Sequence, residues 1–382
     1  MIFPVTVNSS SKISVFIVDD SALVRSALSI ILSKVAEIEV LGVASNPKLA
    51  LTKMKKNWPD VIISDLEMPE MHGLEFLDYL NKNHPTPFIV CSSYAGVGAQ
   101  ASIDALALGA ADIISKPSLG VESYLEEITG TIIESIKAAA SYRSETRKLF
   151  FEKTAGENTP VDLTHKARPR TAPTPVVYDT ENHHKLEFRP LNIIAIGSST
   201  GGTTVIEHIL RQLSPQCPPV LIVQHMPMHF TDAFARRLNS FCSITVKEAK
   251  DGELIQKGTA FIAPGGKHME LVRNIHGFAL RVFDGPLVNR HKPSVDTLFN
   301  SVADVCAKSS LGVILTGMGK DGSLGLLRMK QKGALTIAQD EGSSAVYGMP
   351  KAAIDIGATD INLSIAEIGS YLENFTAKMD YS

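Results

Sequence analysis

Residues 192–202 read NIIAIGSSTGG, so that an apolar run passes directly into a turn of small residues. Apolar residues at helical spacing follow from Thr203 to Leu213, and we therefore predict a buried strand, a tight turn and a helix. A serine in such a turn has an exposed hydroxyl, with free helix N–H groups nearby to stabilise an oxyanion. Ser198, Ser199 and Thr200 could instead simply cap the helix, and this stretch taken alone favours capping.

The same alternation of strands and helices occurs twice in the chain, over residues 13–130 and again over residues 191–375. Repeated β/α units indicate parallel sheets with helices on both faces. We predict an α/β protein with an N-terminal (βα)5 domain and a C-terminal three-layer α/β/α domain whose sheet is mostly parallel. Residues 141–190 carry mixed charges and then several prolines with little apolar periodicity, which predicts a flexible linker.

The composition indicates a globular protein and argues against a protein that binds nucleic acid or inserts into a membrane. The chain has 382 residues, of which 44% are hydrophobic and 20% charged, as is usual for a globular protein of about two domains. Its net charge of −3 argues against nucleic acid as a partner. Four scattered cysteines without a CxxC pair indicate reduced thiols in the cytoplasm. We expect no membrane insertion, because no apolar run approaches about 20 residues. We expect no signal peptide, because Met1-Ile2-Phe3-Pro4 lacks a charged n-region and a long apolar h-region.

Polar side chains follow four strands of the predicted N-terminal sheet, where parallel strands bring ligand-binding groups together. They are Asp19, Asp20, Asp65, Ser92 and Lys116. The three carboxylates suit Mg²⁺, and a carboxylate beside that ion can accept a phosphoryl group. Ser92 and Lys116 could hold the phosphoryl oxygens. Each residue alone could be a helix cap or a solvated loop residue, but their convergence favours a site.

These residues resemble the receiver domain of two-component response regulators. The matching set is the acidic pair Asp19-Asp20, Asp65 followed by Met68-Pro69 and Gly73, then Ser92 and Lys116-Pro117. The resemblance implies that Asp65 is the phosphorylated residue. We expect Mg²⁺ to be held by Asp20, Asp65 and the Glu67 carbonyl. One departure is Ile113, where many receivers have an aromatic switch residue.

Three strands of the predicted C-terminal sheet end in reactive side chains: Ser199, His225 and Asp321. A histidine can take the proton of a serine, and a carboxylate on its other nitrogen fixes the tautomer. His225 could instead be a structural loop residue, and Asp321 a turn residue. Residues 289–296 could simply cap a helix over 295–308, with Ser294 as N-cap. The residues alone leave the triad and the structural interpretation equally open.

Longer motifs of this domain resemble the chemotaxis protein-glutamate methylesterase (CheB) family. They cover residues 196–202, 224–227, 262–265, 285–296, 315–322 and 347–350. The resemblance implies that Ser199 is the nucleophile, His225 the base, Asp321 its orienting carboxylate and the Met318 amide an oxyanion donor. It implies demethylation of glutamate methyl esters and deamidation of certain glutamines, with no cofactor at the esterase site.

The implied partners are methyl-accepting chemoreceptors as substrates and a chemotaxis histidine kinase as phosphodonor, with the protein cytoplasmic and recruited to membrane receptor arrays. A catalytically silent binding module remains the alternative, and a DNA-binding regulator is disfavoured by the charge and by the lack of a basic recognition helix. We also expect the unphosphorylated receiver to cover part of the Ser199 edge, because a tether keeps the two domains at high effective concentration.

Overall fold

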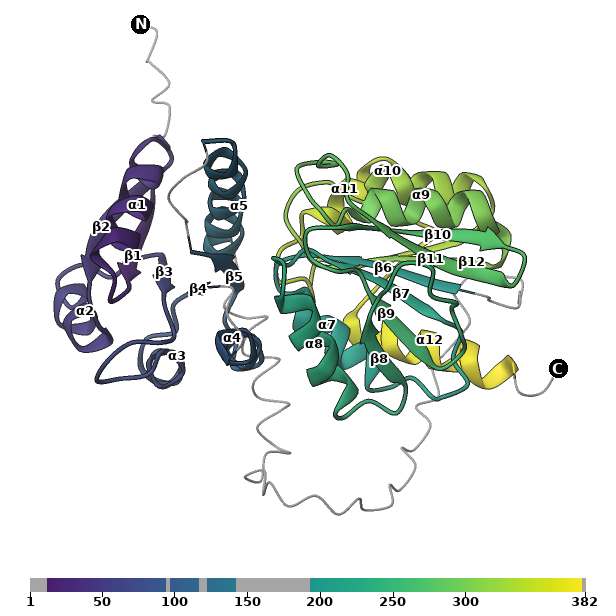
Figure 1. The fold of residues 1–382 in the computed structure, drawn as a ribbon, viewed down its shortest axis with the longest axis horizontal. Coiled ribbons are helices and arrows are strands. Elements are labelled where there is room, and N and C mark those ends of the chain that lie inside the picture. The colour runs from purple at the N-terminus through teal and green to yellow at the C-terminus, as the bar shows by residue number, and fades with distance from the viewer. Residues whose placement is uncertain (1–11, 94–96, 117–121, 142–192, 380–382) are drawn as a thin grey trace, which may run out of the picture.

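Two parallel sheets organise the chain in the computed structural model, which describes residues 12–93, 97–116, 122–141 and 193–379 (Figure 1). The predicted linker over 141–190 lies almost wholly outside the described residues. No described helix is both long enough and apolar enough to cross a membrane.

The N-terminal sheet has five parallel strands in the order β2-β1-β3-β4-β5. The strands are β1 Ile13–Val18, β2 Ile38–Ala44, β3 Val61–Ser64, β4 Phe88–Ser92 and β5 Asp112–Ser115. The helices are α1 Ala22–Ser33, α2 Pro47–Met54, α3 Gly73–Asn83, α4 Val97–Ala107 and α5 Glu122–Ala140. Helices α1 and α5 cover one face and α2 to α4 the other, so apolar strands such as Val-Ile-Ile-Ser of β3 are buried on both sides.

The C-terminal sheet has seven strands, all paired in parallel, in the order β14-β13-β12-β6-β7-β9-β8. The strands are β6 Ile193–Ser198, β7 Val220–Gln224, β8 Thr245–Glu248, β9 Thr259–Ile262, β12 Ser310–Ile314, β13 Leu335–Gln339 and β14 Ile361–Leu363. The chain moves away from β6 in one direction to β7 and in the other to β12. This reversal of strand order places a crevice at the carboxyl ends of the three central strands.

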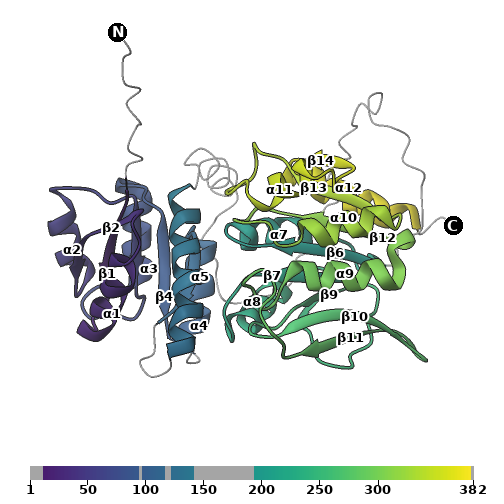
Figure 2. The ribbon, with the colours of Figure 1, turned by 90° about the horizontal axis from the view of Figure 1, so that it is seen from above.

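Helices cover both faces of this sheet and make it a three-layer α/β/α domain (Figure 2). On one face lie α7 Gly202–Leu210, α8 Phe230–Asn239 and α12 Ile365–Met379. On the other lie α9 Val295–Cys306, α10 Ser323–Gln331 and α11 Met349–Asp355, with the short 3₁₀ turn Ala307–Ser309 after α9. An antiparallel hairpin, β10 His268–Asn274 with β11 Gly277–Phe283, packs beside α9.

The two domains lie side by side, with α4 of the first packed against α7 and α8 of the second (Figures 1 and 2). Buried apolar residues form one continuous cluster from the N-terminal sheet through α4 to α8. An ion pair of 3.7 Å between Arg237 of α8 and Asp104 of α4 crosses the same interface. The α4–β5–α5 side of the N-terminal domain therefore faces the C-terminal domain.

Two strands were absent from the sequence prediction, β8 and β14. Both are edge strands of three or four residues, and their sequences, Thr-Val-Lys-Glu and Ile-Asn-Leu, contain polar residues. Edge strands are short and polar because one side remains unpaired. Periodicity over so few residues is too weak to reveal them.

Candidate active site and acidic site

Only one of the three hydroxyl residues in the turn after β6 is accessible at the surface. Ser198 is fully buried and Thr200 is 5% exposed, whereas Ser199 keeps part of its surface. Helix α7 begins at Gly202, and its N-cap is Gly201 in the left-handed region at φ 77°, with no side chain capping the helix. The capping interpretation is therefore wrong. Gly201 takes the cap position because a side chain there would be strained and would lie 2.5 Å from Ala345.

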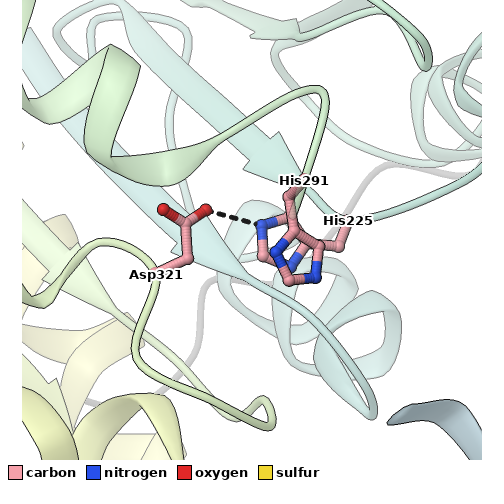
Figure 3. A group of neighbouring side chains, drawn as sticks. All are labelled: His225, His291 and Asp321. Carbon is pink, nitrogen blue, oxygen red and sulfur yellow. Dashed lines mark hydrogen bonds and ion pairs between the residues drawn. The ribbon is translucent and has the colours of Figure 1, made fainter. Parts of the chain in front are cut away.

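His225 and Asp321 come together at the ends of β7 and β12, the two strands that flank β6 (Figure 3). The Nε2 atom of His225 lies 2.8 Å from Oδ2 of Asp321, and both side chains are nearly buried. A carboxylate at that distance favours the tautomer with a proton on Nε2. The other ring nitrogen, Nδ1, is then the basic one. It is buried and has no hydrogen-bond partner among the described residues.

Ser199 lines the same cavity as His225 and Met318. Gln224 links Ser199 to His225, since its Nε2 donates to the backbone carbonyl of Ser199 at 2.9 Å and to that of His225 at 3.1 Å. No hydrogen bond joins the Ser199 hydroxyl to His225 in the described part of the chain, as is common in a structure without substrate. The sequence analysis gave no role to Gln224, although it is the last residue of a predicted strand.

The chain after β12 approaches the serine turn closely. The amide of Ser199 donates to the carbonyl of Thr316 at 3.0 Å. A Cβ atom on Gly317 would lie 2.6 Å from Cβ of Ser199 and 2.3 Å from the sulfur of Met349, so only glycine fits. Met318 is thereby brought to the wall of the cavity beside Ser199. The oxyanion role that the family resemblance implies for its amide stays a prediction.

Asp321 is held by the loop over residues 289–296, for which helix capping was one interpretation of the sequence. Its Oδ1 accepts hydrogen bonds from the side chains of Asn289 and Ser294, each at 2.8 Å. Its Oδ2 accepts one from the amide of Val295 at 2.7 Å. Ser294 occupies the N-cap position of α9, but its hydroxyl makes no bond to the helix, so the capping role predicted for that side chain is wrong.

These bonds keep the Asp321 carboxylate charged. Burial alone would raise its pKa, but the hydrogen bonds from His225, Asn289 and Val295 outweigh burial and hold the pKa well below its usual range. Asn289 also donates to Asp296 at 2.7 Å, and Asp296 accepts from the amide of Gly325 at 2.6 Å. The orientation of Asp321 therefore depends on a second carboxylate that never contacts His225.

His291 was given no role by sequence reasoning, yet its ring stacks on that of His225, with centroids 3.7 Å apart and planes 7° apart (Figure 3). Ligand atoms of His225, His291 and Asp321 lie within 4.8 Å of one another, which is close enough to raise the question of a metal site. The lone pair of an imidazole nitrogen lies in the ring plane, and a metal must lie in the plane of each ring that binds it. Two parallel stacked rings cannot share an ion in that way.

The acidic site of the first domain has the arrangement expected from the strand ends. The carboxylates of Asp19, Asp20 and Asp65 offer ligand atoms within 4.8 Å of one another. Nζ of Lys116 lies 2.6 Å from Asp65 and 3.0 Å from Asp19. Burial disfavours the charged lysine, but hydrogen bonds to both carboxylates outweigh burial and raise the pKa of Lys116. Burial raises the pKa of Asp19. An all-oxygen donor set of this kind fits a hard divalent cation.

Ser92 and Glu67 lie at the rim of the acidic site. Ser92 is 5% exposed at the end of β4, and its carbonyl accepts from the amide of Lys116 at 2.9 Å. A Cβ atom on Gly98 would meet the Ser92 hydroxyl at 3.3 Å and the Glu67 carboxylate at 3.4 Å. Ser92 and the Glu67 side chain therefore face the same small space. The role expected for the Glu67 carbonyl stays a prediction.

The cavity at Ser199 lies between the two domains and has a volume of about 370 Å³. Ile113 of β5 and Glu134 of α5 line it from the first domain, and Ser199 and His225 from the second. Thr200, beside Ser199, donates to Asp112 of β5 at 3.4 Å. The N-terminal domain thus covers the Ser199 edge, and the residue at the aromatic switch position, Ile113, forms part of the cover.

Comparison with known proteins then gives the family. The response regulator receiver domain matches residues 15–127, and the CheB methylesterase family matches residues 194–372. Protein-glutamate methylesterase/protein-glutamine glutaminase 3 of Leptospira interrogans is 49% identical over 363 residues, which span 95% of this chain and 100% of that protein. The chain belongs to the CheB methylesterase family.

A second relative, protein-glutamate methylesterase/protein-glutamine glutaminase 2 of Dechloromonas aromatica, is 46% identical to this CheB-family chain and covers 94% of it and 97% of the relative. The crystal structure of the Thermotoga maritima CheB methylesterase catalytic domain is 37% identical, over 49% of this chain and 99% of that one, with a TM-score of 0.47. The family models and the two relatives show that the chain is a methylesterase with a receiver domain, which confirms the family, the α/β fold and the hydrolase class predicted from the sequence motifs.

Proposed function

We propose that this CheB-family enzyme hydrolyses glutamate methyl esters on methyl-accepting chemoreceptors, with Ser199 as nucleophile, His225 as base and Asp321 as the carboxylate that orients the base. The observation that carries the proposal is the 2.8 Å contact between His225 and Asp321 on the two strands that flank the strand ending in Ser199. The relatives are named as glutamate methylesterases and glutamine glutaminases, which supports both substrates.

The chemistry follows from the protonation states. Nδ1 of His225 takes the proton of the Ser199 hydroxyl as Oγ attacks the ester carbonyl carbon. The carbonyl oxygen becomes an oxyanion, which the Met318 amide stabilises. The bond to the methoxy group breaks, and the imidazolium returns its proton so that methanol leaves. Water then attacks the acyl-serine by the same proton transfers and releases glutamate. With a glutamine side chain, ammonia leaves in place of methanol.

In the receiver, Asp20, Asp65 and the Glu67 carbonyl would hold Mg²⁺, and the ion supplies positive charge beside the phosphoryl group that Asp65 accepts. Lys116 and Ser92 would hold the phosphoryl oxygens. The expected donor is a chemotaxis histidine kinase, and the chain would work in the cytoplasm at membrane receptor arrays. At the esterase site we propose a reaction without a metal, because stacked rings cannot share an ion.

Regulation would act through the cover over the Ser199 edge. In the structure three residues of the receiver line the cavity that contains Ser199: Asp112, Ile113 and Glu134. Asp112 also accepts a hydrogen bond from Thr200, the residue after Ser199. A receptor helix is too bulky to enter a cavity closed in this way. Phosphorylation of Asp65 would shift the receiver away from this face, and a typical coupling free energy of about 1–3 kcal/mol changes activity about 5- to 150-fold.

The test is methanol release from methylated receptor membranes by Ser199→Ala, with and without a small phosphodonor. Loss of a triad nucleophile costs several orders of magnitude, so turnover should fall below about a thousandth of the wild-type value. Ser198→Ala is the matched control, because that neighbouring hydroxyl is fully buried. Retention of more than about a tenth of wild-type turnover by Ser199→Ala would show that the assignment is wrong, and a wild-type chain that releases no methanol would leave only a binding role.

A further inference from the structure

A second imidazole lies beside the proposed base and takes no part in the reaction steps derived above. The ring of His291 stacks on His225 and is 21% exposed at its side chain. Its Nδ1 lies 2.8 Å from the carbonyl oxygen of Asn289. Burial, with the nearby His225, lowers the pKa of His291 to about 3. The stacked ring is therefore uncharged at neutral pH.

A neutral ring in this position has two effects on His225. It covers one face of the His225 imidazole and so restricts rotation of that ring away from Asp321. Its π face also attracts the imidazolium that forms on His225 during acyl transfer, whereas a charged ring would repel it. Both effects favour a base whose Nε2 stays on Asp321 and whose Nδ1 stays in the cavity.

The loop that carries His291 is built tightly enough to position a ring. Val288 and His291 exchange backbone hydrogen bonds of 3.1 and 2.9 Å across a two-residue turn. The two residues of the turn, Asn289 and Arg290, both lie in the left-handed region, at φ 52° and 68°. Asn289 uses its side chain to hold Asp321 and its carbonyl to hold His291. One turn thus places both neighbours of the proposed base.

The receiver contacts the same ring. Glu134 of α5 has one carboxylate oxygen 3.5 Å from Nε2 of His291 and the other 3.5 Å from Arg290. A neutral imidazole has a single N–H, so it cannot donate to the Asn289 carbonyl and to Glu134 at once. In the docked arrangement Glu134 is therefore a second acceptor near that one proton, more distant than the Asn289 carbonyl. Donation to Glu134 leaves the Nδ1 lone pair facing the Asn289 oxygen and loosens the anchor of the ring.

We propose that His291 is a positioning residue for His225, and that the receiver weakens this positioning when Glu134 competes with Asn289 for the single N–H of the ring. The proposal rests on the proposed function, because it requires His225 to be the base. Under this proposal the docked receiver inhibits in two ways: it covers the Ser199 edge, and it disturbs the ring that keeps the base in place.

The first experiment compares His291→Ala with His291→Phe in the full-length chain, by methanol release from methylated receptors at saturating phosphodonor. Misplacement of a catalytic group costs about 100-fold in well-oriented reactions, so we expect kcat of His291→Ala to fall about 10- to 100-fold with KM little changed. His291→Phe keeps the stacked ring and should stay within a few-fold of wild type. Equal losses in both variants, or a wild-type kcat in His291→Ala, would overturn the positioning role.

A second readout separates positioning from a general loss of structure. Long-range ¹H–¹⁵N spectra of histidine-labelled protein report the tautomer of His225. Wild type and His291→Phe should show one tautomer, with the proton on Nε2, whereas His291→Ala should show a mixture. If His291→Ala keeps a single Nε2–H tautomer, the ring does not hold His225. If Ser199→Ala is active, the proposed function itself is wrong, and the inference about His291 is wrong with it.

The contribution of Glu134 is tested without phosphodonor, where the receiver is docked. We expect Glu134→Ala, which removes the competing acceptor, to raise turnover about two- to fivefold, the range for a partly exposed charge contact. The gain should persist in the Arg290→Ala background and vanish in the His291→Phe background, since phenylalanine has no N–H to share. A gain that survives His291→Phe and disappears with Arg290→Ala would show that Glu134 acts only through Arg290, and would refute the competition.

Discussion

The acidic site of the receiver and the proposed triad both lie at the carboxyl edge of a parallel sheet, but different forces hold them together. In the receiver, Lys116 joins Asp19 and Asp65 directly, so opposite charges on neighbouring strand ends make the site. In the second domain, Asp321 is held by neutral donors, Asn289 and Ser294, which come from a loop outside the sheet.

The difference has a chemical reason. Charges at a receiver site must remain available to an incoming phosphoryl group and a cation, so a flexible lysine is a suitable partner. A triad carboxylate must keep one orientation through every turnover, and several fixed hydrogen bonds provide that better than one mobile charge. Substitutions that change hydrogen-bond geometry should therefore damage the second site more than the first.

The largest effect is expected for Asp321→Asn, which keeps the shape of the side chain but removes its charge. An amide cannot fix the Nε2–H tautomer of His225, and loss of a triad carboxylate lowers turnover by about 10³- to 10⁴-fold. The matched control is Asp296→Asn, because Asp296 binds Asn289 and Gly325 without touching His225. Its loss should not exceed about tenfold. Equal losses in methanol release, with native circular dichroism in both variants, would contradict the role of Asp321.

The next effect concerns the ion, and it tests whether the receiver is the charge-dependent site. Excess chelator should abolish phosphorylation of Asp65 by a small phosphodonor and with it the stimulation of methanol release, a change of about 5- to 150-fold. Basal release without phosphodonor should not change. Full phosphorylation in chelator would refute the metal role of Asp20 and Asp65, and loss of basal release would place a required metal at the esterase site.

The same contrast explains what the sequence could predict. Ser199, His225 and Asp321 were candidates because each follows an apolar strand and parallel strands bring their ends to one edge, but their roles came only from the resemblance to the methylesterase family. The acidic site was identifiable for the same reason. Residue spacing along strands and helices carries this information, so the two sheets, the five helices of the first domain and helices α7 and α9 of the second were also predicted. The short edge strands β8 and β14 were missed because three or four residues show no clear period.

What was missed at the site comes from contacts between segments distant in sequence. Asn289 and Ser294 contact Asp321 across 32 and 27 residues of chain, and the same positions read equally well as a helix cap. The stacking of His291 on His225 depends on the path of a left-handed turn, which Asn favours but Arg does not. The contact of Glu134 with that turn depends on docking of the receiver, which no motif encodes.

A smaller effect should appear in the pH dependence of stability, and it distinguishes the neutral stacked ring from the charged pairs of the receiver. An unfolded histidine titrates near 6.5, whereas folded His291 has a pKa of about 3. Between these values only the unfolded chain binds the proton, so stability falls as pH decreases from 6.5 toward 3. His291→Phe removes this loss, about 1–2 kcal/mol at pH 5, which is a few degrees in Tm.

The measurement for His291 is Tm against pH for wild type, His291→Phe and the control His276→Phe, whose histidine is exposed at the tip of the β10–β11 hairpin. The difference between wild type and His291→Phe should widen from pH 7 to pH 5, while His276→Phe should stay parallel to wild type. Parallel curves for all three proteins would mean that His291 is not held neutral by burial.

The smallest effect is expected at the interface between the two sites, where Asp104 of the receiver faces Arg237 at 3.7 Å. Asp104→Lys turns this attraction into repulsion. Partly exposed pairs contribute less than about 1 kcal/mol, so methanol release without phosphodonor should rise only about two- to fivefold.

Adding Arg237→Glu restores opposite charges and should return release to its basal value. Asp78→Lys is the control, since Asp78 pairs with Lys82 of its own helix. Release at saturating phosphodonor should be the same in every variant, because we propose that the phosphorylated receiver no longer covers Ser199. If Asp104→Lys lowers basal release, the docked receiver activates the esterase, and the proposal that it inhibits by covering Ser199 is wrong. If basal release does not change, the apolar cluster between α4 and α8 holds the receiver in place, and charge governs the acidic site but not the docking.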